Sequence, residues 1–300
     1  MTLFVRVRRV VALSVLGAVL AGCGGETSGP PGNGPGAAGE RSGAAGPSPT
    51  TASGSPSAAA RTRPVPALPP GPDGLTPVFE RASDPASGAP EKTVALTFDA
   101  DMTADQGPRA ARGERFDNPE LIATLRRLKV DATVFMTGRW AEEYPDQARS
   151  IGTDQRFEIA NHSYSHHAFK APCYGLPVLP RQDMAADVRR AFDAFRAAGA
   201  RNVVPYFRFP GGCYDRTALR ALAPAEVTAV QWDVVSGDAF AEDPDAVAEQ
   251  VLAGVRPGSL VVMHCTRSAA PVTEQAVRRI VPELRARGYR FVKVSELMAT

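Results

Sequence analysis

Two histidines, His162 and His166, stand four positions apart in the segment 161–167, which reads NHSYSHH. On a helical turn this spacing places both imidazoles on one face. Two imidazole nitrogens and one carboxylate form a site for a divalent metal that leaves coordination positions open. The plainer alternative is a pair of surface histidines on a polar turn. The adjacent His167 points away from the shared face, so we expect it to pack or to face solvent.

Further side chains that can do chemistry fall at or just after the ends of apolar runs. These are Asp99, Asp101, Arg208, Asp233, Asp238 and His264. In folds built from parallel strands and helices, functional residues collect at the carboxyl ends of the strands. The sequence therefore predicts that these side chains and the two histidines share one site.

The elements that must position them alternate along the chain. Strand patterns cover 93–98, 132–136, 157–160, 203–208 (interrupted by Pro205), 227–233, 259–264 and 289–294, and helical patterns cover 119–129, 184–198, 245–255 and 272–287. Continuous apolar strands between helices favour a parallel sheet covered on both faces. Seven such units predict an α/β fold, a seven-stranded (β/α) barrel rather than an open sheet.

The N-terminal residues have the pattern of an export signal. Three arginines precede an apolar run of 12 residues, 10–21. A membrane-spanning helix needs about 20, so the run fits the apolar region of a signal peptide over residues 1–22. It ends in Leu-Ala-Gly-Cys, which resembles a bacterial lipobox, and Cys23 is then the lipidated first residue of the mature chain. The alternative is an ordinary signal peptide with Cys23 as an ordinary thiol.

A tether is predicted to follow. Residues 24–71 contain 11 Gly and 10 Pro, a composition that does not form a packed core. We assign 23–90 to the lipidated cysteine and tether, and 91–300 to the folded domain. The whole chain has 34 Lys and Arg against 32 Asp and Glu, and three of the arginines lie in the signal. The mature chain is thus nearly neutral, which argues against a nucleic-acid partner.

Three cysteines remain beyond Cys23. An odd number in an exported protein fits one disulfide and one buried thiol. We expect Cys173 to pair with Cys213, and Cys265, at the end of an apolar strand pattern, to pack as a small hydrophobic residue.

Taken together, the motifs resemble those of NodB-like polysaccharide deacetylases, carbohydrate esterase family 4. Five segments appear in the family's order: Thr97–Asp101, His162–His166, Arg208–Gly212, Val235–Ala239 and Val262–His264. They span most of the predicted domain. The resemblance implies a distorted (β/α) barrel of the NodB type.

The first family motif, Thr-Phe-Asp-Asp, departs from the pattern here. The resemblance makes Asp99 the general base. Ala100 stands where the family has a second Asp that binds the metal, and an acid follows at Asp101. We expect Asp101 to replace the missing ligand. The alternatives are a site with two protein ligands, or one with Asp99 on the metal.

The second and third motifs are closer to the family. His162 and His166 are implied as metal ligands. Arg208 would pair with Asp99 and keep its carboxylate ionised. The family usually has an aromatic residue where Gly211 stands, so the N–H of Gly211 could assist the oxyanion while the groove wall is lost there.

In the fourth motif Val235 replaces the first acid and Ala239 the usual Trp, with Phe240 beside it as a partial replacement. The resemblance implies that Asp238 orients His264, the general acid of the fifth motif. Val262 takes the place of the family's Leu beside the acetyl methyl group.

For Trp232 and Asp233, which lie earlier on the same strand, we expect core packing and a satisfied strand-end acid.

The resemblance implies a metal-dependent hydrolase of carbon–nitrogen bonds. One divalent metal would be held by Asp101, His162 and His166, with zinc as the default and cobalt, nickel or iron as alternatives. The substrate class is an acetylated polysaccharide, and the predicted anchor and tether favour cell-wall peptidoglycan. The expected protein is a monomer, lipid-anchored to the outer face of the cell membrane, with its domain reaching into the wall. The alternatives are an O-acetyl xylan-type esterase, a catalytically dead anchored glycan-binding protein, or a small-molecule amidohydrolase.

Overall fold

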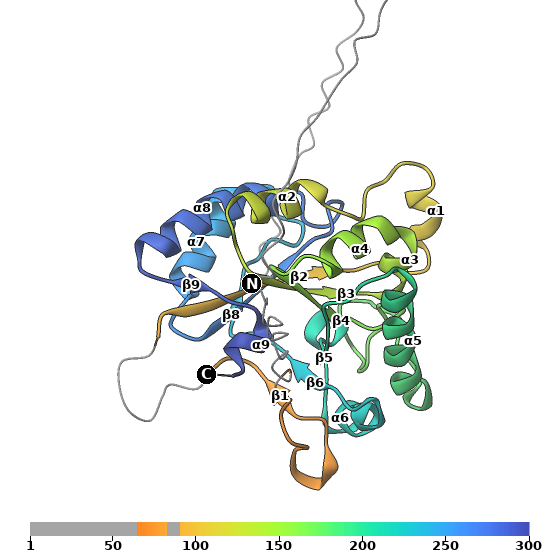
Figure 1. The fold of residues 1–300 in the computed structure, drawn as a ribbon. Helices are drawn as coiled ribbons and strands as arrows, with labels where there is room; N and C mark the ends of the chain where they lie inside the picture. The colour runs from red at the N-terminus through yellow and green to blue at the C-terminus, as the bar shows by residue number, and fades with distance from the viewer. Residues whose placement is uncertain (1–64, 66, 83–90, 300) are drawn as a thin grey trace, which may run out of the picture. The chain divides into compact units, whose positions relative to one another are not determined.

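Parallel strands form one curved sheet that positions the candidate site residues (Figure 1). The computed structural model describes residues 65, 67–82 and 91–299, all within one compact unit, Ala60–Thr300. Its strands are β1 (Val78–Phe79), β2 (Thr93–Ala100), β3 (Ala132–Met136), β4 (Phe157–Asn161), β5 (Val203–Phe207), β6 (Thr228–Val230), β7 (Val234–Val235), β8 (Ser259–His264) and β9 (Arg290–Phe291). Their order is β1-β6-β5-β4-β3-β2-β8-β7, and β9 pairs with β2.

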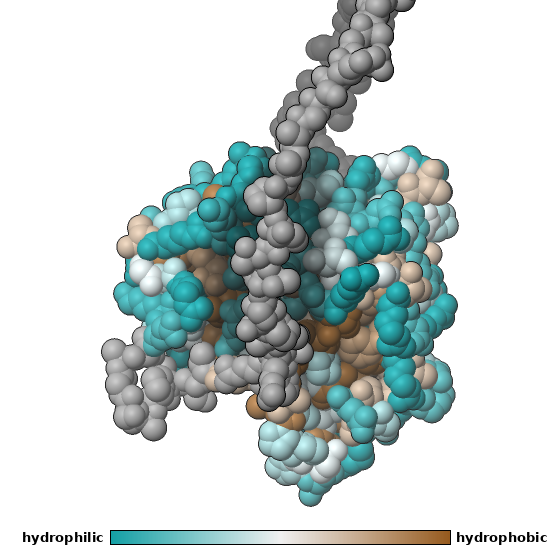
Figure 2. All heavy atoms as spheres, in the orientation of Figure 1, coloured by the Kyte–Doolittle hydropathy of each residue, from teal (hydrophilic) through white to brown (hydrophobic). Residues whose placement is uncertain are grey.

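The helices lie around the outside of this sheet (Figure 1). They are α1 (Gln106–Ala110), α2 (Pro119–Arg127), α3 (Gly138–Glu143), α4 (Pro145–Gly152), α5 (Met184–Ala197), α6 (Arg216–Leu222), α7 (Pro244–Gly254), α8 (Thr273–Ala286) and α9 (Val294–Leu297). Apolar side chains at helical spacing face the sheet, while Figure 2 shows mostly hydrophilic residues over the outer faces of α5, α7 and α8. No helix in the described part of the chain is long and apolar enough to cross a membrane.

The predicted distorted (β/α) barrel is confirmed, but the number of strands was wrong. The described residues form nine strands rather than seven. The pattern at 227–233 ends early in β6, and a separate β7 follows it. The pattern at 289–294 is a two-residue strand followed by α9. Among the described residues no pairing joins β1 to β7, so the barrel is open between them.

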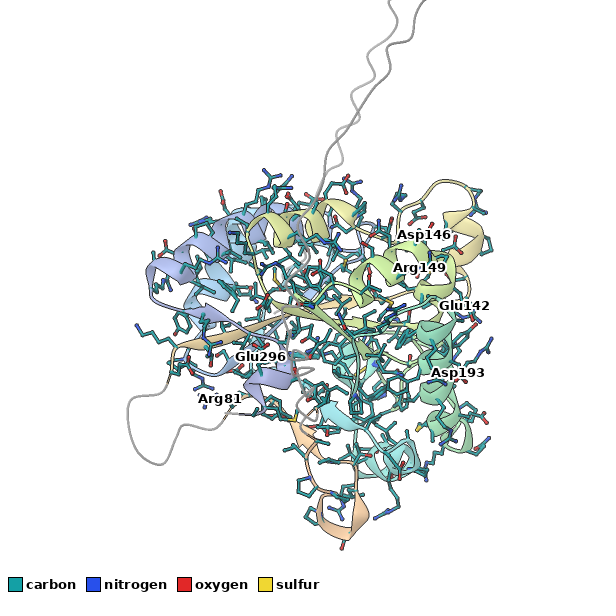
Figure 3. The ribbon with its side chains drawn as sticks, in the orientation of Figure 1. Arg81, Glu142, Asp146, Arg149, Asp193 and Glu296 are labelled. Carbon is teal, nitrogen blue, oxygen red and sulfur yellow. A yellow bond between two sulfur atoms is a disulfide. The ribbon has the colours of Figure 1, made fainter. Side chains whose placement is uncertain are left out.

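Strand β1 comes from a segment that we predicted to be tether. The boundary at residue 90 lies too late, because residues 67–82 pack on the domain. Val78 and Phe79 of β1 pair with β6, and Leu75 is buried. Arg81, labelled in Figure 3, donates from Nη2 to the carbonyl oxygen of Pro257 at 3.0 Å. The predicted signal peptide, Cys23 and most of the predicted tether lie outside the described residues.

The cysteine prediction is confirmed for the described residues. Cys173 and Cys213 form a disulfide, and Cys265 is a buried free thiol. The disulfide joins the loop after β4 to the turn after β5. Both segments follow the carboxyl ends of their strands, where the candidate site residues lie.

Candidate active site

A buried ion pair forms the floor of the site. Asp99 lies near the end of β2, and Arg208 follows β5. Arg208 Nη1 donates to Asp99 Oδ1 at 2.6 Å, and the Arg208 side chain is fully buried. Its Nε also donates to the carbonyl oxygen of Val230 at 3.3 Å, and its guanidinium lies 3.8 Å from the centre of the Phe135 ring. These contacts hold the guanidinium where it stabilises the Asp99 carboxylate.

The two histidines lie together, but not on the helical turn that their spacing predicted. The segment after β4 is an irregular loop in which Ser163 and His166 adopt left-handed backbone angles, with φ of 69° and 57°. Side chains replace helical hydrogen bonds: Asn161 Oδ1 accepts from the Ser163 N–H, and Ser163 Oγ accepts from the His166 N–H. The His162 and His166 rings lie 5.0 Å apart.

Each histidine faces one of the two carboxylates. His162 Nε2 lies 3.7 Å from Asp99 Oδ2, and His166 Nε2 lies 3.7 Å from Asp101 Oδ2. Burial lowers the pKa of His162, and it lowers the pKa of His166 to about 4. Both imidazoles are therefore neutral near pH 7, the state in which histidine binds a metal.

Asp101 is held by the segment that follows β8, the neighbour of β2 in the sheet. Its Oδ1 accepts a hydrogen bond from the Thr266 hydroxyl, which also lies 3.2 Å from the Asp101 backbone nitrogen. Burial raises the pKa of Asp101, but the imidazoles of His166 and His264 and the Thr266 hydroxyl outweigh burial and lower it. The displaced acid of the first motif is thus an oriented carboxylate beside His166.

A second dyad lies on the other side of Asp99. His264 ends β8, directly opposite Asp99 in the strand register. Its Nδ1 lies 2.8 Å from Asp238 Oδ1, and its backbone N–H donates to Asp238 Oδ2 at 2.7 Å. Burial lowers the pKa of His264, but the hydrogen bond and negative charge of Asp238 outweigh burial and raise it to about 9. His264 is therefore protonated near pH 7.

The donor chemistry at this edge fits a divalent cation. His162 Nδ1 lies 3.0 Å from the carbonyl oxygen of Arg208, which assigns the ring proton to Nδ1 and leaves a lone pair on Nε2. That lone pair faces Asp99, and two acceptors facing each other are favourable only with a cation or proton between them. In the described residues no three His, Cys, Asp or Glu side chains yet converge as a closed ligand set. A cation held by both imidazoles and Asp101 would have to draw the His166–Asp101 pair toward His162, whose Nε2 faces Asp99 in the structure.

Sequence reasoning missed the hydroxyl groups that orient these acids. Thr266 holds Asp101, Thr273 Oγ1 donates to Asp238 Oδ2 at 2.7 Å, and Ser236 Oγ donates to Asp238 Oδ1 at 2.9 Å. Thr266 lies two residues beyond His264, and this proximity is the only feature of the sequence that points to a role in the site. The apolar pattern of α8 does not identify Thr273 as a partner of Asp238.

The remaining predicted positions differ in their exposure. Gly211 lies in the turn after β5 with φ of 64°, and Val262 is buried in β8. Val235, in place of an acid, is exposed. Phe240, beside Ala239, is also exposed and has φ of 59°.

The expectations for Trp232 and Asp233 have different outcomes. Asp233 is satisfied, because its Oδ1 accepts from the Leu260 N–H at 2.7 Å and its Oδ2 accepts from the Ser259 hydroxyl at 2.9 Å. Trp232 packs partly on the core, but its ring also lies 5.4 Å from the Arg208 guanidinium.

Comparison with known proteins agrees with this arrangement. A family model described as polysaccharide deacetylase matches residues 86–230. The chitooligosaccharide deacetylase of Sinorhizobium fredii is 31% identical over 215 residues, covering 68% of this chain and 91% of that protein. This chain belongs to the polysaccharide deacetylase family.

Other members of the family differ in what their names say they act on. A peptidoglycan-N-acetylglucosamine deacetylase of Bacillus cereus is 26% identical, covering 69% of this chain and 89% of that protein. A solved family 4 pseudoenzyme from Bacillus anthracis is 24% identical, with a TM-score of 0.59 over 77% of this chain and 70% of that one, and shows the fold alone. As a polysaccharide deacetylase family member with named deacetylases among its relatives, the chain is a hydrolase.

Proposed function

We propose that this protein is a metal-dependent N-deacetylase that removes acetyl groups from cell-wall peptidoglycan. The observation that supports this most directly is that two side-chain dyads lie next to each other on neighbouring strands. Asp99 with Arg208 and His264 with Asp238 lie side by side at the carboxyl ends of β2 and β8. One dyad pairs a carboxylate with an arginine and the other holds an imidazolium, so the site offers a base and an acid together.

Asp99 is the proposed base. Arg208 stabilises its carboxylate through Oδ1, which leaves Oδ2 on the side of His162. From there Asp99 accepts a proton as a water attacks the acetyl carbonyl carbon. Because Arg208 is buried and bonded to backbone carbonyl groups, Asp99 keeps its orientation during proton transfer.

His264 is the proposed acid. It must hold a proton that it can give to the departing amine nitrogen, and its raised pKa keeps that proton in place near pH 7. Asp238 bonds to Nδ1 and so directs Nε2 toward the substrate side. Proton uptake by Asp99 and proton release by His264 together break the amide and leave a free amine and acetate.

Asp101, His162 and His166 are the proposed ligands of the divalent cation. When bound, such a cation polarises the acetyl carbonyl and lowers the pKa of a water. Zinc is the metal expected for two imidazoles and one carboxylate. The N–H of Gly211 is proposed as a donor to the developing oxyanion. The Thr266 hydroxyl orients Asp101, and the carbonyl oxygen of Arg208 orients the ring of His162.

The proposal of a wall substrate is supported by the predicted signal and tether. A lipid on Cys23 would anchor the chain to the outer face of the membrane, and a Gly- and Pro-rich segment would let the domain reach wall glycan. The Bacillus cereus relative is named for peptidoglycan, and the Sinorhizobium relative for chitooligosaccharides. N-acetylglucosamine is the sugar that these two substrates share.

The test is acetate release by the full chain loaded with zinc. Substrates would be N-acetylglucosamine oligomers, intact peptidoglycan and O-acetylated xylan, with Asp99→Asn and His264→Ala as matched variants. The proposal requires zinc-dependent release from N-acetylated glycan and loss of at least about a hundredfold in each variant. Release from acetyl xylan alone would reassign the substrate to an ester. Bound glycan without release from any substrate would leave a binding protein.

A further inference from the structure

Two adjoining glycines beside the site each lie under an aromatic ring. Gly211 and Gly212 both have left-handed backbone angles, with φ of 64° and 69°. A Cβ on Gly211 would lie 2.6 Å from Cys173 Sγ and 3.1 Å from Cδ2 of Tyr174. A Cβ on Gly212 would lie 2.5 Å from Cη2 of Trp232. The missing side chains therefore make the room that these two rings occupy.

Both rings lie against the turn that follows Arg208 of the catalytic dyad. Trp232 lies 5.4 Å from the Arg208 guanidinium, which binds Asp99. Gly211 and Gly212 follow Arg208 in the turn after β5, so each ring packs on a residue of the turn that leaves the dyad. Tyr174 therefore lies against Gly211, whose N–H is the proposed oxyanion donor.

Tyr174 is exposed and yet held in place. The residue is 88% exposed, and its φ is 46°, a conformation that is costly for a residue with a Cβ. The neighbouring Cys173 is fixed by its disulfide to Cys213, two residues beyond Gly211. The Leu176 N–H closes the turn by donating to the carbonyl oxygen of Cys173 at 2.8 Å. Burial of the Tyr174 ring does not explain this arrangement, because the ring buries little surface.

We propose that Tyr174 is a substrate-binding residue, an aromatic wall on which one pyranose ring of the glycan stacks beside the sugar that is deacetylated. This inference rests on the proposed function. The faces of a pyranose ring present C–H groups that pack on an aromatic face, while its hydroxyl groups remain in water. In this proposal the wall that the sequence predicts to be lost at Gly211 is supplied by a ring from a disulfide-held loop instead of by the turn itself.

The experiment compares Tyr174→Ala, Tyr174→Phe and the control Val178→Ala, whose side chain is exposed on the same loop. The probe is the tetramer of N-acetylglucosamine with the full chain. Calorimetry measures Kd, and acetate release measures KM and kcat. Tyr174→Ala should raise Kd and KM about three- to tenfold with kcat unchanged, as expected for one lost aromatic contact. Tyr174→Phe keeps the ring and should bind like the wild type.

The binding measurement separates the two hypotheses. If the wild type binds the tetramer but releases no acetate, the proposed function fails while the Kd values still test Tyr174. If the wild type is active and Tyr174→Ala matches Val178→Ala in Kd and KM, the aromatic wall is refuted and the proposed function stands. If the wild type binds neither the tetramer nor peptidoglycan fragments, the proposed role of Tyr174 in binding is also refuted. Thermal melting of each variant checks that the fold is kept.

Discussion

At the scale of single residues, the displaced acid Asp101 is the main departure from the family pattern. Its carboxylate is oriented by Thr266 and lies beside His166. Asp101→Asn keeps the shape and removes the charge, so we expect it to lose bound zinc. Thr266→Val removes only the orienting hydroxyl, so we expect zinc affinity to fall about 10- to 100-fold. Zinc stoichiometry and competition with a chelator measure both.

A contrary result would identify another carboxylate. Asp99 stands at the same distance from His162 as Asp101 does from His166. Full zinc occupancy in Asp101→Asn, together with loss in Asp99→Asn, would place Asp99 on the metal and remove it from the role of base.

The pH dependence of activity should follow His264. Its pKa of about 9 lies above the ordinary 6.5, so the protonated acid is lost, and activity falls, as pH rises through about 9. A bound cation repels the imidazolium, lowers its pKa and so moves the alkaline fall in activity to lower pH. Asp238→Asn removes the charge that raises the pKa of His264 and should move this fall in activity to still lower pH. A kcat/KM profile that is the same in Asp238→Asn and wild type would show that another group is the acid.

Stability should share this dependence in the metal-free protein. The folded-state pKa of His264 is raised, so the His264–Asp238 pair contributes stability that is complete below the unfolded pKa near 6.5 and is lost as pH rises through about 9. Urea unfolding at pH 6 and pH 10, in the wild type and in His264→Gln, measures this contribution. Equal pH sensitivity in both proteins would contradict it.

At the scale of elements, the turn after β5 depends on its glycines. Gly211→Ala places a methyl group in a left-handed backbone position, 2.6 Å from Cys173 Sγ, so we expect a loss of about 1–3 kcal/mol of unfolding free energy. Gly74→Ala is the matched control, because φ is 68° there and no atom lies within 4 Å of the added Cβ. Chemical denaturation should show a smaller loss in the control. Equal losses of unfolding free energy in the two variants would mean that the disulfide-bonded loop moves to make room for the methyl group.

Loops explain where site prediction from the sequence succeeded and where it did not. The strand-end rule brought Asp99, Arg208 and His264 to one edge because parallel strands share a direction. The histidine spacing was read as a helical turn, whereas side-chain hydrogen bonds from Asn161 and Ser163 shape a loop. Contacts between loops, such as Thr266 with Asp101, depend on which strands are neighbours, and strand order is not visible in local patterns.

At the scale of the whole molecule, residues 67–82 complete the domain. Thr76 Oγ1 donates to the carbonyl oxygen of Leu219 at 2.9 Å, and β1 covers the edge of β6. Removing residues 1–82 should lower the free energy of unfolding by about 2–4 kcal/mol, because the buried contacts of Leu75 and the hydrogen bonds of this segment are lost. Removing 1–64 is the control and should cost little. Equal urea midpoints for the two truncations would show that the segment is dispensable.

The repeating strand and helix pattern predicted the barrel but not its edges. The patterns at 132–136 and 259–264 coincide with β3 and β8, because long apolar strands are buried on both faces. The two-residue strands β1, β7 and β9 were missed or misread, since two residues show no periodicity. The short helices α1, α3, α4 and α6 were missed because five to eight residues make only one or two helical turns, too few to establish a helical period.

The buried thiol of Cys265 has a consequence for how the protein fails when heated. In the folded chain it is 1% exposed, and burial raises its pKa to about 12, so it has almost no thiolate to attack the Cys173–Cys213 bond. Unfolding brings that pKa back toward about 8.5 and frees the sulfur to exchange. Heat inactivation at alkaline pH should then become irreversible through scrambled pairings, and Cys265→Ala or a thiol-blocking reagent present during heating should restore refolding.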